Sequence, residues 1–328
     1  MNINNKVALD FDDVVIRPKP SIVNSRKDVD LKVNYDNVYT GIPVVVSPMT
    51  TTGTISMAQR LHAKAFNVGI HRYYDVEILR EFFQTKDAEH SWMTIGPTDD
   101  ELSRYNEVSH WCPRLIVDTA NGYTAKYVDF IKHICYKYPD TIIVAGNVCT
   151  PEGCENLIEA GAHIIRCGLS WGSACTTRHK TAIGLPTFQT ILDCKDICKE
   201  KGVLLMADGG IRCVADICKS LAAGANVVLC GGLFAGYNEN EVEWWYKDGE
   251  NHPYMTFYGM SSKLANDRYN GGLKDYRAAE GCELEIKHKG NIGELLQDIE
   301  GGLASCCTYT NSQSVYRLGF GSQFNRIR

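Results

Sequence analysis

The chain has 328 residues, of which 44% are hydrophobic and 22% charged, and its formal net charge is −5. This composition supplies a core large enough for one α/β barrel, and an acidic balance without a basic run argues against nucleic acid as a partner. No apolar stretch is long enough to span a membrane and no signal peptide opens the sequence, so fourteen cysteines scattered along the chain predict buried, reduced thiols in the cytoplasm.

Residues 1–40 are polar and irregular, and residues 9–18 form their most ordered-looking piece. From there, short apolar runs alternate with longer helix-compatible segments, which predicts βαβ units and parallel strand pairing. Eight runs favour a closed TIM (β/α)8 barrel over a doubly wound sheet, which would carry Gly-x-Gly-x-x-Gly after its first strand. The predicted strands are residues 42–46, 66–70, 92–95, 115–117, 141–144, 163–167, 203–207 and 226–230. The predicted helices include residues 55–65, 76–83, 124–138, 151–160, 185–199 and 212–223.

The eighth predicted strand is not followed promptly by its helix, which is expected only at residues 292–305. Residues 234–289 intervene and are rich in glycine, tyrosine, asparagine and charged residues. A connection of this length inside a compact domain is usually functional, and loops at this end of a barrel often act as lids. We therefore interpret residues 234–289 as an active-site flap on a single catalytic barrel, residues 1–328, with residues 1–40 as its N-terminal segment.

Glycine pairs follow the seventh and eighth predicted strands, as Gly209-Gly210 and Gly231-Gly232. The active site of a TIM barrel lies at the C-terminal ends of its strands, where such pairs present backbone N–H groups to a phosphate. Each pair alone would indicate only a tight turn, but two on adjacent strands predict a phosphate site. Asp208 lies beside them, positioned either to accept both hydroxyl groups of a ribose or to cap the following helix.

The loop after the sixth predicted strand, residues 168–178, is built from small and hydroxylated residues around Cys175. Glycine and serine let backbone N–H groups approach an anion closely, and such donors around a cysteine favour the thiolate, its reactive form. The loop is therefore interpreted as a nucleophilic cysteine beside a phosphate site. The alternative is an ordinary loop that contains one of fourteen cysteines.

Residues 172–178 read Gly-Ser-Ala-Cys-Thr-Thr-Arg, and this stretch resembles the active-site signature of the IMP dehydrogenase and GMP reductase family. Residues 9–18, 208–210 and 229–236 are similar to the same family. The segments that distinguish its members resemble the reductase branch without a gap, namely residues 257–262, 271–281 and 302–309. The chain leaves no room for the paired CBS regulatory modules that are usual in the dehydrogenases.

This resemblance implies NADPH-dependent reductive deamination of GMP to IMP and ammonia, a reaction of purine salvage, in a cytoplasmic homotetramer. It assigns Cys175 as the nucleophile that forms a thioimidate at purine C2, with Thr177 and Glu280 handling the proton. The implied substrate contacts are Ser173, Asp208, Gly209, Gly210, Gly231, Gly232, Tyr258, Gly259, Met260, Ser261, Arg277 and Gly281. The implied cofactor-side residues are Met49, Arg72, Asp118 and Asn121. Backbone carbonyls that would hold K⁺ belong to Ser170, Gly172 and Cys175.

The sequence departs from the family pattern in the predicted site. Ser170 and Trp171 replace a glycine and a proline, which counts against potassium because serine has less backbone freedom than glycine. Thr50 stands where relatives carry aspartate, and Arg72 replaces the lysine usual in the reductases. These changes leave open a diverged member that acts on another purine nucleotide.

Two further alternatives stay open. Arg268-Tyr269 resembles the pair that activates water in the dehydrogenases, which would oxidise IMP to XMP with NAD. The ungapped reductase match instead predicts Tyr269 as a packing residue and Arg268 as a surface charge. The third alternative is a non-catalytic nucleotide-binding protein, which the intact set of Cys175, Thr177 and Glu280 disfavours.

Overall fold

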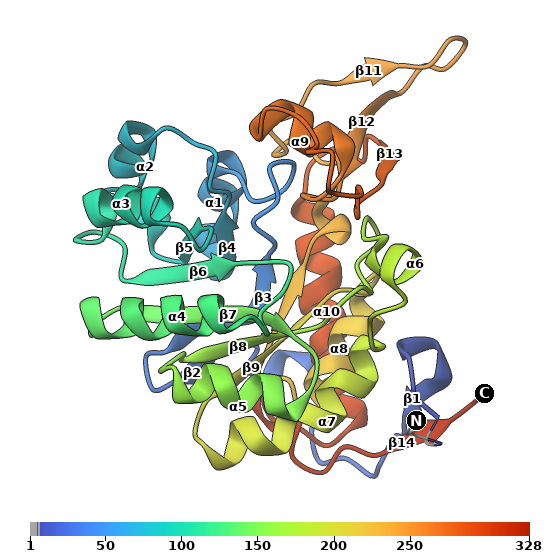
Figure 1. Cartoon of the computed structure of the whole chain (residues 1–328). Helices are drawn as coiled ribbons and strands as arrows, with labels where there is room; N and C mark the ends of the chain where they lie inside the picture. The colour runs from blue at the N-terminus through green and yellow to red at the C-terminus, as the bar shows by residue number, and fades with distance from the viewer. Residues whose placement is uncertain (1–4, 6) are drawn as a thin grey trace.

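Eight parallel strands form a closed ring at the centre of the computed structural model, which describes residues 5 and 7–328 (Figure 1). The ring consists of β3 (Tyr39–Val46), β4 (Phe66–Ile70), β5 (Ser91–Ile95), β6 (Arg114–Asp118), β7 (Ile142–Val148), β8 (Ile164–Cys167), β9 (Leu204–Asp208) and β10 (Val227–Cys230). It closes because β10 pairs in parallel with β3, with Val228 opposite Val44. The predicted TIM barrel is confirmed, and β2 (Val33–Tyr35) adds an antiparallel edge to β3.

The barrel strands are mostly apolar on both faces, which is why they read as short hydrophobic runs. In β3, Val44 and Val46 pack toward the surrounding helices, whereas Val45 points into the barrel. Inside, Val45 belongs to a cluster with Trp92 and Met206, so the barrel interior is a packed core. All eight strands therefore match the predicted runs to within a few residues.

Helices cover the outside of the ring, and most follow the predicted segments. They are α1 (Ile55–Leu61), α2 (Val76–Phe83), α3 (Asp99–Val108), α4 (Ala125–Lys137), α5 (Pro151–Glu159), α7 (Thr187–Glu200), α8 (Val214–Ala223) and α10 (Gly293–Tyr309). Short 3-10 turns are η1 (Phe11–Asp13), η2 (Arg26–Asp28), η3 (His62–Lys64), η4 (Lys86–Ala88), η5 (Gly232–Phe234) and η6 (Val315–Arg317). The sequence analysis missed α3 because that helix is mostly polar and buries only Leu102, Tyr105 and Val108.

The segment between β10 and α10 forms a small structure of its own. It contains the antiparallel sheet β11 (Trp245–Tyr246), β12 (Pro253–Tyr258) and β13 (Glu283–Lys287), together with α9 (Lys263–Tyr269). Figure 1 shows these elements at the end of the barrel where the short helix α6 (Thr177–Thr181) lies. The insertion therefore stands beside the loop that carries Cys175. Its opening and closing as a flap remains a prediction.

The two ends of the described chain meet, because β1 (Val14–Ile16) pairs antiparallel with β14 (Phe324–Arg326). Asp10 precedes them and caps η1, accepting the Phe11 N–H at 2.7 Å. Of the predicted N-terminal segment, residues 1–4 and 6 lie outside the described residues. Among the described helices, none has the length and apolarity needed to cross a membrane.

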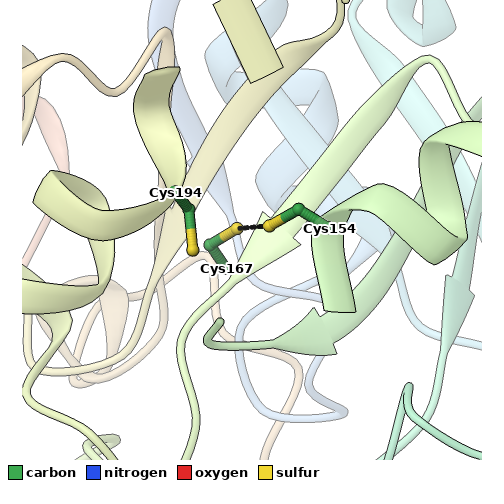
Figure 2. A group of neighbouring side chains, drawn as sticks. All are labelled: Cys154, Cys167 and Cys194. Carbon is green, nitrogen blue, oxygen red and sulfur yellow. Dashed lines mark hydrogen bonds between the residues drawn. The ribbon is translucent and has the colours of Figure 1, made fainter. Parts of the chain in front are cut away.

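All fourteen cysteines carry free thiols, and nine of them are buried. Cys154, Cys167 and Cys194 come from α5, β8 and α7 and meet in the core with their sulfur atoms within 4.8 Å of one another (Figure 2). The thiols of Cys154 and Cys167 are 3.5 Å apart. The hydrogen bond with Cys154, together with burial, holds the pKa of Cys167 well above its ordinary value, so this thiol stays protonated. Cys154 and Cys167 therefore act here as small packing groups.

His71 follows β4 directly, and its burial predicts that the folded state loses stability in acid. Its ring stacks on Tyr74 at 4.1 Å between centroids, and burial lowers its pKa to about 4. Between pH 6.5 and 4 the unfolded chain binds a proton that the folded chain does not, so stability falls as the pH drops through this window. We expect wild type to lose about 2 kcal/mol more than His71→Gln between pH 7.5 and pH 5, measured by urea unfolding. Equal losses in the two proteins would contradict this assignment.

Candidate active site

The loop after β8 carries Cys175 across the end of the barrel. Gly168, its first residue, has a φ of 143°, and a Cβ there would overlap the backbone oxygen of Asp208. The glycine therefore lets the loop cross directly against the end of β9. Cys175 follows, half-buried, and α6 begins two residues later at Thr177.

The insertion after β10 pairs with this loop through backbone hydrogen bonds. Thr176 N–H donates to the Glu280 carbonyl at 2.8 Å, and Cys282 N–H donates to the Ala174 carbonyl at 3.0 Å. A Cβ at Gly259 would lie 2.5 Å from the Ala174 oxygen, so only glycine permits this approach. These contacts bring a segment a hundred residues away in sequence into register with Cys175.

Three side chains form a continuous hydrogen-bonded series at this junction. The Cys175 thiol donates to the Thr177 hydroxyl at 3.3 Å, and that hydroxyl donates to Glu280 Oε2 at 2.7 Å. A hydroxyl that both accepts and donates can pass a proton from the thiol to the carboxylate and back. The arrangement therefore joins a nucleophile to a proton acceptor.

Cys175, Thr177 and Glu280 open onto a cavity of about 780 Å³ at the C-terminal end of the barrel. Both glycine pairs line this cavity, and Gly209 and Gly210 have positive φ values of 87° and 74°. A Cβ at Gly232 would lie 3.0 Å from Ser173 Oγ, so only a small residue fits beside that hydroxyl. The other predicted residues that line the cavity are Met49, Asp118, Ser170, Gly172, Asp208, Gly231, Gly259, Met260, Ser261 and Gly281.

Tyr258 does not line this cavity, although the resemblance assigned it to the phosphate. Its side chain is 2% exposed, and its hydroxyl lies 2.9 Å from Thr50 Oγ1 and 3.4 Å from the Tyr269 hydroxyl. Tyr269 in turn stacks on Tyr73 at 4.2 Å, as a packing residue does. The hydroxyl of Thr50 thus binds the insertion to the loop after β3.

Three further predicted residues lie outside the cavity lining. Arg72 donates to the Tyr73 hydroxyl at 3.1 Å and lies over that ring. Asn121 is exposed and accepts the Tyr123 N–H, which is a local turn contact. Arg277 is exposed on the insertion. The structure therefore brings these side chains to the surroundings of the site and not into it.

Arg166, which the sequence analysis missed, connects the two carboxylates assigned to substrate and cofactor. Its Nε donates to Asp208 Oδ2 at 2.9 Å, and its Nη1 forms an ion pair with Asp118. Asn147 also donates to Asp208 Oδ2, at 2.7 Å. The sequence did contain a signal for this role, namely a charged residue within an apolar strand. A charged residue is rarely buried without a partner of opposite charge.

This buried ion pair has a measurable expected effect on stability. The Arg166 side chain is 10% exposed, so Arg166→Met leaves Asp118 and Asp208 without their cation. We expect a loss of about 3 kcal/mol in the free energy of unfolding, measured by urea titration. The exposed pair of Arg80 and Glu107 is the control, and Arg80→Ala should cost about 0–1 kcal/mol. Similar losses in both variants would refute a special role for Arg166.

The carbonyls predicted to hold K⁺ do not fit that ion as they stand. The Ser170 oxygen accepts Arg178 Nη1 at 3.4 Å, and the Gly172 oxygen accepts the Cys175 N–H at 3.0 Å. Two of the three predicted ligands therefore already have partners within the chain. Ser170 does adopt the left-handed conformation, with a φ of 71°, although it is not glycine.

A second binding region lies on the far side of the cavity. In the ring of eight strands, β6 lies opposite β10, where the phosphate-type loops gather. Asp118, Thr119 and Ala120 line the cavity at the end of β6. A carboxylate and a hydroxyl suit the hydroxyl groups of a ribose. Asp118 and Thr119 therefore offer, at the end of β6, polar groups of the kind that bind a nucleotide.

The sequence is similar to known proteins over nearly its whole length. A family model described as the IMP dehydrogenase / GMP reductase domain matches residues 8–328. The chain is 37% identical to GMP reductase 2 of Bos taurus, over 99% of this chain and 96% of that protein. It is 37% identical to GMP reductase of Onchocerca volvulus, covering 99% and 92%, and 36% identical to GMP reductase of Vibrio vulnificus strain YJ016, covering 100% and 97%.

Proposed function

The chain belongs to the IMP dehydrogenase / GMP reductase family, and on that premise we propose that it converts GMP to IMP and ammonia with NADPH as reductant. The observation that carries the proposal is the hydrogen-bonded series from Cys175 through Thr177 to Glu280. That series faces a cavity with glycine pairs on one side and a carboxylate on the other. The near-full-length similarity to proteins named GMP reductase supports the same substrate.

The first chemical step replaces the amino group of GMP with a sulfur bond. The Cys175 thiol gives its proton to Thr177 and Glu280, and the thiolate attacks purine C2. The bond from C2 to the exocyclic nitrogen breaks, and the departing amine takes the proton back as ammonia. The hydrogen bonds from thiol to hydroxyl to carboxylate run in the direction that this transfer requires.

The second step releases the purine as IMP. NADPH, held beside Asp118 and Thr119, would supply the hydride for C2, and Cys175 would then leave C2 as the thiolate and take up a proton through Thr177. Asp208 and the glycine pairs hold the ribose and phosphate in place during both steps. Asp118 and Thr119 hold the cofactor side, and Arg166 keeps the Asp118 and Asp208 carboxylates oriented.

The runner-up is oxidation of IMP to XMP with NAD, in which Arg268 and Tyr269 would activate water. Tyr269 stacks on Tyr73, and Arg268 lies exposed over the Tyr258 ring. Neither side chain lines the cavity that holds Cys175. This packing favours the reductase, as does the similarity to reductases. A diverged purine substrate is the remaining alternative.

Parallel assays test the proposal against both alternatives. NADPH consumption is followed with GMP and a panel of other purine nucleotides, and NAD⁺ reduction is followed with IMP. We expect NADPH oxidation that is fastest with GMP and produces one ammonia per NADPH. Formation of NADH and XMP from IMP would establish the dehydrogenase, and a faster rate with another nucleotide would establish a diverged substrate. A homotetramer in the cytoplasm remains a prediction, and light scattering checks the assembly.

A further inference from the structure

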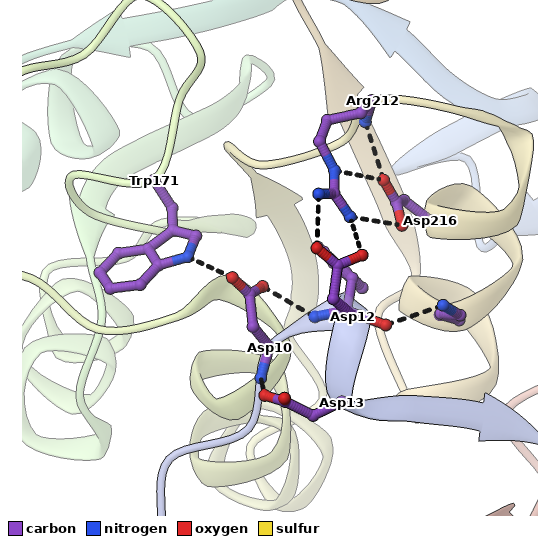
Figure 3. A network of polar contacts seen from close by, with 8 residues as sticks. Asp10, Asp12, Asp13, Trp171, Arg212 and Asp216 are labelled. Atoms are coloured by element: carbon purple, nitrogen blue, oxygen red, sulfur yellow. Dashed lines mark hydrogen bonds and ion pairs between the residues drawn. The ribbon is translucent and has the colours of Figure 1, made fainter. Parts of the chain in front are cut away.

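Trp171 ties the Cys175 loop to the N-terminal segment of the chain. Its indole Nε1 donates to Asp10 Oδ2 at 2.6 Å, although 161 residues separate the two (Figure 3). Asp10 is itself held, because its other oxygen accepts the Phe11 N–H at 2.7 Å and its own N–H donates to Asp13. The indole is therefore fixed at its polar edge and has one orientation beside the loop.

Arg178 lies on this fixed ring. Its guanidinium carbon is 4.6 Å from the centroid of Trp171, the geometry of a cation–π contact. From there Nη1 reaches the Ser170 carbonyl at 3.4 Å. Arg178 directly follows Thr177 at the C-terminal end of the loop. Its guanidinium group therefore connects that end of the loop to Ser170 near the beginning.

The Ser170 carbonyl needs such a partner, because the backbone around it is strained. Ser170 has a φ of 71°, a left-handed conformation that costs a non-glycine residue about 1–2 kcal/mol. The residue is 5% exposed, which limits compensation by water. The contact from the Arg178 guanidinium to the Ser170 carbonyl joins the two ends of the loop at this strained residue.

We propose that Arg178, positioned by Trp171 and Asp10, supplies the positive charge that the family resemblance assigned to K⁺, so that the Cys175 loop keeps its reactive geometry without a monovalent cation. The Gly172 carbonyl accepts the Cys175 N–H, so one of its two lone pairs is already used within the loop. Arg178 and Trp171 are positioning residues here, since they act through the loop and not on the substrate.

A cation series tests the proposal without turnover. Wild type is placed in K⁺, Na⁺ or tetramethylammonium chloride at equal ionic strength. The rate at which iodoacetamide alkylates Cys175 is read by peptide mass spectrometry, and thermal unfolding is recorded in parallel. We expect both to be unchanged across the three salts. A rise of about tenfold in alkylation rate in K⁺, or an unfolding midpoint specific to K⁺, would overturn the proposal. Neither readout requires that GMP is the substrate, so this test can fail while the proposed function stands.

Substitutions identify the residues responsible. Arg178→Ala should lower the Cys175 alkylation rate about fivefold, as expected for loss of an exposed cation–π contact. Millimolar guanidinium should restore part of that rate, because the free ion fits the vacated place. Trp171→Phe keeps the ring but loses the bond to Asp10, and it should show a smaller loss. Lys180→Ala, which removes an exposed cation from the same helix, is the control and should match wild type. A guanidinium-insensitive Arg178→Ala, or an equal loss in Lys180→Ala, would contradict the assignment.

Discussion

Cys175→Ala is expected to lower kcat for NADPH-dependent GMP reduction by about 10⁴-fold or more, because no other group on the loop can form the bond to purine C2. Binding should persist, since the proposed nucleotide contacts, Asp208 and the glycine pairs, lie at the ends of β9 and β10 and do not involve this side chain. Stopped-assay rates and the dissociation constant for GMP measure the two effects separately.

Cys213→Ala is the matched control, because Cys213 is exposed and precedes α8 outside the cavity lining. It should keep the wild-type rate. A Cys175→Ala protein that turns over within tenfold of wild type would remove the nucleophile from the account. Loss of GMP affinity together with kcat would instead indicate that the substitution had disturbed the loop.

Glu280→Gln is expected to lower kcat by about 10²–10⁴-fold, the usual contribution of a positioned acid–base group. Glutamine keeps the size of the side chain but cannot accept the proton that Thr177 passes on. Because Thr177 and Glu280 act as one unit, Thr177→Val combined with Glu280→Gln should be little slower than Glu280→Gln alone. Initial rates of NADPH oxidation at saturating GMP measure all three variants.

Glu283→Gln is the control, an exposed carboxylate three residues further along the same insertion. It should leave the rate unchanged. Multiplicative losses from Thr177→Val and Glu280→Gln would show that the two side chains act independently, against the hydrogen-bonded series.

The barrel could be predicted because its strands are buried on both faces, so that each reads as an apolar run between turn residues. The helix α3 escaped detection because ten mostly polar residues give little periodic signal, and only its Thr98 cap marks its start. The order β11–β12–β13 and its pairing with the Cys175 loop could not be read from the sequence, because both depend on contacts between distant segments.

The site shows the same division. The placement of Asp208, and of the loop that carries Cys175, follows from the barrel alone, because all C-terminal strand ends meet at one face. The role of Arg166 could not be predicted without knowing that Asp118 on β6 and Asp208 on β9 lie within reach of its guanidinium group. The buried position of Tyr258, with its hydroxyl against Thr50, could not be read from the sequence because the two residues are 208 positions apart.

The most direct test of the account is the mass of the protein after incubation with GMP in the absence of NADPH. The account predicts an adduct of one GMP minus ammonia, located on the peptide that contains Cys175, with an equal amount of free ammonia. The adduct should be absent from Cys175→Ala and should disappear when NADPH is added. The covalent mechanism would be contradicted if the protein oxidised NADPH with GMP but never carried this adduct, and if its Cys175→Ala variant remained active.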